Sequence, residues 1–399
     1  MSSGGRGARD LLVATAISGG TGYVIIVAAG AVLDAVTFTA FAGFWSAVYL
    51  GVSALTGVQQ EFARATRPTS AAVVQERTRS AAPALVLLTV LGSVVVLTMA
   101  VVSSGGSGGV TVAAVVAAIA ALAGNVLAAA YGGIAAGLLR WRLAAAIVAL
   151  DGVIRLLLVA AALLFSPTFP ALVTAIVLPF VITPLVIRVL GRSTLAGGFS
   201  VDVARGRLLR NILGTMLGAT AMGVMISGYP FVLTVLSADD GAKALAPVLL
   251  MLSLVRAPIA IVMLSLQSFF IVSLRDGAGT RWRGLVALII GGGLLVSVAA
   301  VVVGPPVVLA IFGDEYTVGP VLVGAVTMSG ALVGLTCLSG ARALAFNRHD
   351  VYALGWVAAA VAAALAHLLP LPLDARVALS LCLAPAIGSI IHVTSTRRR

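Results

Sequence analysis

Charged residues are scarce in this sequence: they make up 10% of its 399 residues, against 61% for hydrophobic residues. A soluble domain with this balance would expose an almost wholly apolar surface, so the composition excludes that class. The mean hydropathy of +1.16 points the same way. We therefore expect an all-α fold, a polytopic helical membrane protein.

Residues that serve metal, redox or acid–base chemistry are also few. The chain has two cysteines and three histidines, without CxxC or metal-ligand spacing: Cys337, Cys382, His349, His367 and His392. The acidic pair in "ADDG" (238–241) is typical of a turn, and no paired-carboxylate motif is found. We expect no metal, no cofactor and no enzymatic activity.

Apolar runs dominate what is present, and twelve of them are long enough to span a bilayer, which takes about 20 residues. They lie near 11–33, 37–60, 82–103, 111–138, 144–165, 171–190, 211–237, 244–272, 285–310, 320–341, 351–370 and 376–395. The connections alternate between turn-forming or acidic segments and arginine-rich ones. This alternation predicts about twelve transmembrane helices.

The arginine-rich connections predict the orientation. With the N-terminus in the cytoplasm, 21 of the 25 basic residues fall on cytoplasmic segments, and Lys243 and Arg376 fall on the opposite side. Both termini are then cytoplasmic, in a multi-pass protein of the cytoplasmic (inner) membrane. The net charge of +12 thus indicates topology and contact with membrane lipids, and we expect no nucleic-acid partner.

The arginine-rich segment 191–210 divides the chain into two halves of six spans, which predicts lobes at 1–190 and 211–399. The halves are weakly alike. "RDLL" (9–12) opens the first and "RNIL" (210–213) opens the second. In each half the second span carries glutamine near its cytoplasmic end, Gln59 in one and Gln267 in the other.

The stretch "LDGVIRLLL" (150–158) places charges inside an apolar run. Arg155 lies 13 residues, roughly 20 Å, from the cytoplasmic Arg142. A charge at the bilayer centre costs about 2.5–3.5 kcal/mol. Asp151 and Arg155 are four residues apart, share a helix face and can pair. Two interpretations stay open: a structural ion pair, or an Asp151 that titrates or binds a cation during transport.

Arg256 is the other charge at depth, and it has no partner on its own span. It either faces a cavity or is a buried structural charge. Polar residues gather on spans one, two, seven and eight, which suggests that these spans line a shared cavity. Pro230 and Pro258 permit kinks in two of them. Gly133 and Gly137 form a GxxxG pattern that we interpret as helix packing.

Two stretches carry a resemblance to a known family. They are "RDLLVATAISGGTGYVIIVAAGAVLDAVTFTAFAGFWSAVYLGVSALTGVQQEFARA" (9–65) and "LVRAPIAIVMLSLQSFFIVSLRD" (254–276). With the two halves of six spans, the chain resembles the polysaccharide-biosynthesis flippases of the MOP superfamily, relatives of the lipid II flippase and the MATE drug exporters. The resemblance implies a MATE-like fold that moves a polyprenyl-linked glycan across the membrane by alternating access.

The resemblance also implies site residues and partners. Arginines in the cavity of such flippases hold the pyrophosphate or acidic sugar, which makes Arg256 the main substrate-binding candidate, followed by Arg155, Gln267 and Gln59. Asp151 is the candidate for ion coupling. The expected partners are a lipid-linked oligosaccharide, membrane lipids, and glycosyltransferases or polymerases of the same pathway.

The sequence departs from that pattern in one respect, because spans one and two carry no basic residue at depth. The substrate is then less charged, or its phosphates stay near the cytoplasmic Arg64 and Arg67. Two other functions stay open. One is a MATE-like exporter of small molecules, although drug cations favour acidic linings. The other is a non-transporting membrane scaffold of a glycan-assembly complex.

Overall fold

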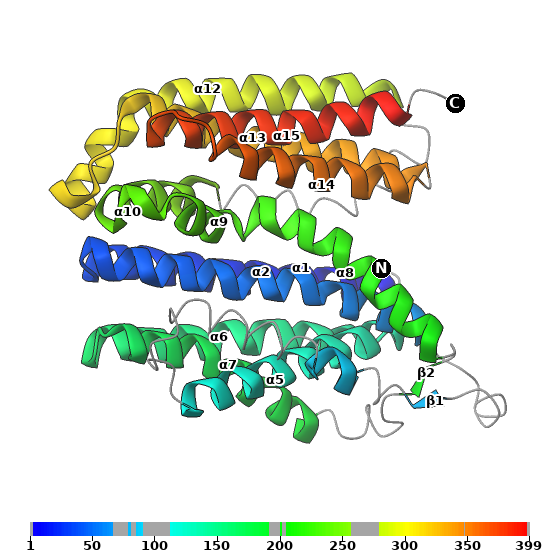
Figure 1. The fold of residues 1–399 in the computed structure, drawn as a ribbon. Helices are drawn as coiled ribbons and strands as arrows, with labels where there is room; N and C mark the ends of the chain where they lie inside the picture. The colour runs from blue at the N-terminus through cyan, green and yellow to red at the C-terminus, as the bar shows by residue number, and fades with distance from the viewer. Residues whose placement is uncertain are drawn as a thin grey trace. The chain divides into compact units, whose positions relative to one another are not determined.

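The computed structural model describes residues 3–66, 79–80, 85–90, 112–190, 200–201, 205–256, 279–346 and 348–396. Its regular elements are almost all helical (Figure 1). The helices are α1 (Ser3–Val32), α2 (Ala35–Ala65), α5 (Val112–Gly137), α6 (Trp141–Phe165), α7 (Phe169–Leu190), α8 (Arg205–Ile226), α9 (Tyr229–Leu236), α10 (Ala242–Met251), α12 (Gly279–Phe312), α13 (Pro320–Ala345), α14 (His349–Ala366) and α15 (Leu373–Thr396). The described part also contains two short 3₁₀ turns, at Ala238–Asp240 (η1) and Asp314–Tyr316 (η3), and a π-helical turn at Leu252–Arg256 (η2). Two strands of two residues each, β1 (Arg79–Ser80) and β2 (Ser200–Val201), form an antiparallel pair.

Within the described residues, ten helices are long and apolar enough to cross a membrane, which confirms the all-α membrane class. Three predicted spans differ from the structure or lie partly outside the described residues. Most of the span expected at 82–103, and 257–272 of the span expected at 244–272, lie outside the described residues. The span expected at 211–237 is broken at Ser227–Gly228 into α8 and α9. Pro230, in the first turn of α9, fits a helix start because it lacks the N–H that an interior position would need.

The helices pack into two compact units. Unit 1 comprises Met1–Thr21, Ala54–Ser166 and Pro170–Ala219, and unit 2 comprises Gly22–Ser53, Pro167–Phe169 and Thr220–Arg399. The limits of the units pass through α1 and α2, so each unit contains part of both helices. The two six-helix lobes predicted at 1–190 and 211–399, joined by the linker 191–210, stay a prediction.

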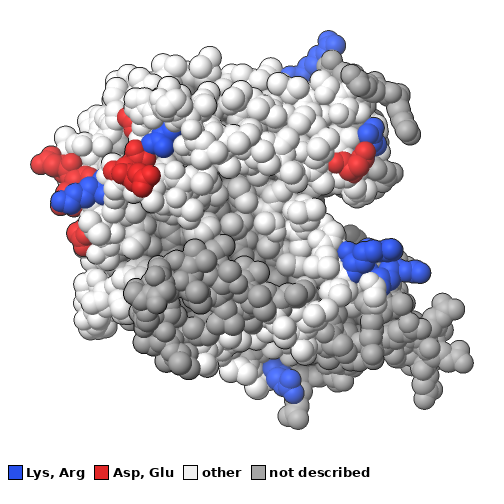
Figure 2. Space-filling model, in the orientation of Figure 1, with Lys and Arg blue, Asp and Glu red and all other residues white. Residues whose placement is uncertain are grey.

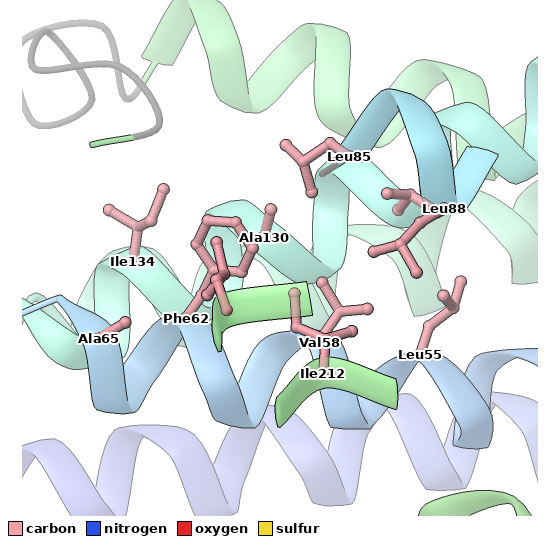
Figure 3. Packing of buried hydrophobic residues seen from close by; sticks show 11 residues of the cluster. Leu55, Val58, Phe62, Ala65, Leu85, Leu88, Ala130, Ile134 and Ile212 are labelled. Carbon is pink, nitrogen blue, oxygen red and sulfur yellow. The ribbon is translucent and has the colours of Figure 1, made fainter. Parts of the chain in front are cut away.

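The core of unit 1 is an apolar cluster where the second half of α2 meets α5, α8 and the helical residues 85–90 (Figure 3). Phe62 and Val58 of α2 are fully buried there, against Ala130 and Ile134 of α5 and Ile212 of α8. These side chains are spaced three and four residues apart on their helices, so each helix presents one apolar face to the cluster.

Glycines allow α5 to approach α2 in this unit. A Cβ on Gly133 would lie 2.4 Å from the backbone oxygen of Gln59, and a Cβ on Gly137 would lie 2.4 Å from that of Thr66. No side chain fits such gaps. The prediction that the Gly133–Gly137 pattern serves helix packing is confirmed.

Unit 2 contains a bundle in which α13 packs against α12 and α15, and α15 packs against α14 (Figure 1). Its interior is partly polar. His392 of α15 is fully buried and bonds Ser339 Oγ of α13 through Nδ1 (3.0 Å) and the carbonyl of Tyr352 in α14 through Nε2 (3.1 Å). Each of the three helices therefore has a polar tie to the same ring.

Charges in unit 2 separate between the two ends of its helices, and acids gather near α10 on the face drawn in Figure 2. The acidic end holds six acids and two bases: Asp34, Asp239, Asp240, Asp314, Glu315, Asp374, Lys243 and Arg376. At the other end, the last turn of α13 holds Arg342, and the start of α14 holds Arg348 with one acid, Asp350. The separation has the form that the positive-inside rule gives to connections on opposite sides of a bilayer.

The acidic end also shows how α2 begins. Asp34 Oδ1 accepts hydrogen bonds from the backbone N–H groups of Val36 (2.9 Å) and Thr37 (3.0 Å), so it caps the helix N-terminus. These bonds, with one from the Thr37 hydroxyl, hold the pKa of Asp34 below its usual value. The hydroxyl of Tyr316 in η3 donates to the carbonyl of Leu33 (3.1 Å), which fixes the turn before α2.

Candidate functional site

Arg256 closes the π-helical turn η2, and its side chain is buried in unit 2 with 3% exposure. Its Nη2 donates to the carbonyl of Met225, near the end of α8, and its guanidinium carbon lies 5.2 Å from the centre of the Tyr229 ring. Among the described residues, its Nε and Nη1 have no hydrogen-bond partner, and no acid lies within salt-bridge distance of it. A buried guanidinium with donors to spare is suited to an anion. A π-helical turn is also frequent at functional sites.

Tyr229 connects Arg256 to a histidine. Its hydroxyl lies 3.0 Å from Nε2 of His367, and Nδ1 of His367 lies 3.3 Å from Oγ of Ser237. All three side chains are almost completely buried. No sequence pattern singles out His367, because it has no metal-ligand spacing and its partners are 138 and 130 residues away.

An ion pair lies next to this histidine, at the acidic end of unit 2. Arg376 Nη2 binds Asp240 (2.5 Å to Oδ2), and Arg376 Nη1 donates to the backbone carbonyl of His367 (3.2 Å). The span of α14 ends at Ala366, one residue before His367. Burial, and next the positive charge of Arg376, lower the pKa of His367 to about 4, although Asp240 opposes this shift. The imidazole is therefore neutral at physiological pH.

Serines of α2 satisfy the backbone where α8 and α9 separate. Ser46 Oγ donates to the carbonyl of Ser227 (2.6 Å) and accepts from the N–H of Phe231 (3.0 Å). Ser53 Oγ lies 2.9 Å from Ser227 Oγ. These residues are among the polar side chains that suggested a cavity lining. In this conformation they bond to each other and to the helix break, and the shared cavity stays a prediction.

The candidates Asp151 and Arg155 lie in unit 1 and form the expected pair. Arg155 Nη2 is 2.5 Å from Asp151 Oδ2, with the arginine side chain 1% and the aspartate side chain 25% exposed. Arg155 Nη1 also donates to the carbonyl of Ile176 in α7 (2.7 Å), and its guanidinium carbon lies 4.3 Å from the centre of the Phe180 ring. The pair joins α6 to α7, as the structural interpretation expects. Whether Asp151 also couples an ion is a functional prediction that this geometry does not test.

The other candidates are placed as follows. Gln59 packs over Gly132 of α5 in unit 1, where a Cβ would lie 3.4 Å from its Nε2. Gln267 lies outside the described residues, as do Pro258 and Arg67. The sequence analysis missed Glu61, which is 2% exposed near the end of α2.

Glu61 binds Arg64 (2.7 Å from Nε to Oε2) and accepts from Asn211 Nδ2 of α8 (2.9 Å). The i, i+3 spacing of Glu61 and Arg64 was the available signal that the two side chains pair. The position of Glu61 near a helix end does not by itself indicate that the acid is buried. Arg64 itself keeps half of its side chain exposed.

Two cavities of about 260 Å³ each lie in unit 2, and neither contains a candidate residue. One is at the acidic end and is lined by Lys243, Glu315 and Asp374 among others. The other is an apolar groove between α2 and α9, lined by Phe44, Phe231 and neighbours. Among the described residues no group of three or more His, Cys, Asp or Glu could hold a metal ion.

The chain is similar in its arrangement of helices to solved structures of membrane transporters. The chain aligns with a multidrug resistance MATE family transporter of the MOP superfamily in its inward-facing conformation, with a TM-score of 0.68, 16% identity and 94% of each chain covered. It aligns with the lipid II flippase MurJ in an inward closed conformation, also with a TM-score of 0.68, at 10% identity over 96% of this chain and 87% of that one. The protein therefore has a MATE-like fold, as expected, and its apolar helices make it a multi-pass membrane protein.

Sequence comparison gives the family itself, although no family model matches the chain. The uncharacterized protein Rv1510 of Mycobacterium tuberculosis (strain ATCC 25618 / H37Rv) is 30% identical over 391 residues, 97% of this chain and 90% of that protein. The uncharacterized protein Mb3654 of Mycobacterium bovis is 31% identical over 96% of this chain and 90% of its own length. The chain belongs to the family of these mycobacterial proteins.

Proposed function

We propose that this protein is a transporter that moves a polyprenyl-linked glycan across the cytoplasmic membrane by alternating access. The observation that carries the proposal is Arg256, a buried guanidinium whose Nε and Nη1 have no partner in the described part of the chain. Leaving such donors unsatisfied costs about 1–3 kcal/mol or more for a charged group. A ligand with phosphate oxygens would recover that cost, and a lipid pyrophosphate supplies them.

The surroundings of Arg256 support a role in a moving site. It follows α10 through a π-helical turn, and it bonds Met225 two residues before the break between α8 and α9. Tyr229, the first residue of α9, contacts it through its ring. A rearrangement at the break would change both contacts, so the availability of the guanidinium would depend on conformation.

The decisive experiment measures which leaflet holds lipid-linked oligosaccharide in cells that carry Arg256→Ala at the protein level of the parent. A lectin or a periplasmic glycosidase reports the outer leaflet. We expect intermediates to accumulate on the cytoplasmic side. The matched control is Arg348→Ala, because Arg348 is partly exposed and pairs with Asp350 at a helix end. Unchanged sidedness in Arg256→Ala, with the protein folded and abundant, would contradict the proposal.

A MATE-like exporter of small molecules is the second candidate, and the fold is equally compatible with it. Drug cations would be repelled by Arg256, which is why we rank it lower. Overexpression followed by resistance testing against cationic and anionic compounds separates the two. A scaffold without transport is the third candidate, for which changes at Arg256 would alter folding or assembly and leave translocation intact.

The expected orientation and the role of Asp151 belong to this proposal. The acid-rich end of unit 2 would face the outside, with both termini in the cytoplasm. Labelling of a single cysteine at Asp374 with an impermeant maleimide in intact cells, against one at Arg348, tests that orientation. If transport is coupled to a cation, Asp151 is the side chain of unit 1 that we propose for it.

A further inference from the structure

His367 binds both ends of one short helix. Tyr229, which bonds Nε2, is the first residue of α9, and Ser237, which bonds Nδ1, is the C-cap of the same helix. His367 itself is the C-cap of α14 and is 2% exposed. A single imidazole therefore fastens α9 to the end of α14.

The bonding pattern suits a neutral ring. A neutral imidazole has one donor and one acceptor nitrogen, and a hydroxyl can take either role, so both contacts are satisfied. An imidazolium has two donors and no acceptor. Both hydroxyls would then have to accept from the ring and direct their own protons elsewhere.

The nearby charges oppose a proton on the ring as well. The charged and titratable groups around it are Arg376 of α15, which bonds its backbone carbonyl, Asp240 of η1, which pairs with Arg376, and Tyr229 with Arg256 behind it. Two guanidinium groups and one carboxylate leave a positive surplus. A second positive charge on His367 would weaken the contacts that hold α9.

We propose that His367 is a proton-operated clasp: a proton bound at the imidazole releases α9 from α14 and lets it move about the break at Ser227–Gly228. The inference rests on the transport function proposed above, for which it supplies a coupling ion and a moving part. Tyr229 connects this change to Arg256, because the same residue bonds His367 through its hydroxyl and contacts Arg256 through its ring. Proton binding would thereby alter the environment of the guanidinium that we assign to substrate.

The size of the effect follows from linkage. The imidazole has a pKa of about 4 when clasped and would return to about 6.5 when released into water. Between pH 7.5 and pH 5.0 this difference shifts the equilibrium toward the released form by about 30-fold.

The test uses the full chain in lipid nanodiscs, with Cys337 and Cys382 changed to alanine. Spin labels at Val235→Cys on α9 and Leu365→Cys on α14 occupy exposed positions, 56% exposed in each case. Pulsed electron paramagnetic resonance then measures their distances at pH 7.5 and 5.0. We expect two populations of molecules, one with a longer and one with a shorter distance between the labels. The ratio of the longer-distance to the shorter-distance population should rise about 30-fold at the lower pH.

Two variants make the result specific. His367→Gln keeps a polar amide that cannot titrate, and it should abolish the pH dependence. His392→Gln changes another buried histidine of unit 2 and should leave it intact. The same pH response in His367→Gln, or none in the parent, overturns the inference.

A second measurement tests the proposal even if His367→Gln does not fold. The chain has three histidines, so ¹⁵N-histidine labelling gives three imidazole signals, which His349→Gln and His392→Gln assign. A neutral His367 ring at pH 7.5 that protonates together with the distance change supports the clasp. A ring that titrates while the distances stay constant refutes it. Neither outcome depends on glycan sidedness, so the clasp and the proposed substrate can fail separately.

Discussion

Asp151→Asn should destabilise the protein because it removes the carboxylate that pairs with Arg155 on the same helix. The Arg155 side chain is 1% exposed, so its charge would stay buried. Removing one member of a buried ion pair costs about 3–5 kcal/mol. The Asp151 side chain is 25% exposed, and we therefore expect a cost somewhat below that range, about 2–3 kcal/mol.

The opposite single change should cost less. In Arg155→Met the carboxyl of Asp151 can protonate or reach water, and methionine still packs on Phe180. The double variant Asp151→Leu/Arg155→Met replaces the pair by apolar contacts and should lie within about 1 kcal/mol of the parent. The double-mutant cycle, closed with the single variants Asp151→Leu and Arg155→Met, then gives a coupling of about 2 kcal/mol.

Unfolding by increasing mole fraction of dodecyl sulfate in mixed micelles, followed by far-ultraviolet circular dichroism, measures these free energies. The control is Asp350→Asn, which breaks the exposed pair with Arg348 and should change stability by less than about 0.5 kcal/mol. Additive single costs in the double variant would refute the structural reasoning. A stable double variant that still transports would exclude Asp151 as the coupling acid, and one that is stable but inactive would favour it.

Three further predictions concern packing, the helix break and pH. Gly133→Ala should cost about 1–3 kcal/mol in the same unfolding assay, because its Cβ would overlap α2, whereas Gly214→Ala meets no atom within 4 Å and should be neutral or stabilising. Ser46→Ala should cost about 1–3 kcal/mol, since two backbone groups at the helix break lose their partner, and calorimetry in nanodiscs would measure it. The free energy of unfolding should fall by up to about 3 kcal/mol as the pH drops from 6.5 to 4. The cause is that the histidine binds a proton in the unfolded chain but, with a pKa of about 4, not in the folded one. His367→Gln should remove this part of the pH dependence.

Most of the fold could be predicted from apolar length alone, because a bilayer forces each span to satisfy its own backbone. The bounds of α6, α13 and α15 agree with their predicted runs to within a few residues. The break at Ser227–Gly228 was harder to predict from the sequence. Pro230 signalled a kink, but the serine that completes the break lies 181 residues away, on α2.

The contacts of the candidate site residues were likewise predictable only in part. The pairing of Asp151 with Arg155 follows from spacing on one helix, and so it was predictable. The contacts of Arg256 with Met225 and of His367 with Tyr229 depend on how separate helices pack, which a single sequence does not encode locally. Long-range polar contacts of this kind are therefore the part that only coordinates reveal.

The serine bridge at the helix break has a consequence for hydration. An unbonded backbone group is costly in a membrane interior, so water stays out of the break only while Ser46 satisfies the two backbone groups there. α9 can then move in one of two ways: it carries α2 with it, or water enters to replace the serine. Solvent entry at this position would report directly on whether the two helices travel together.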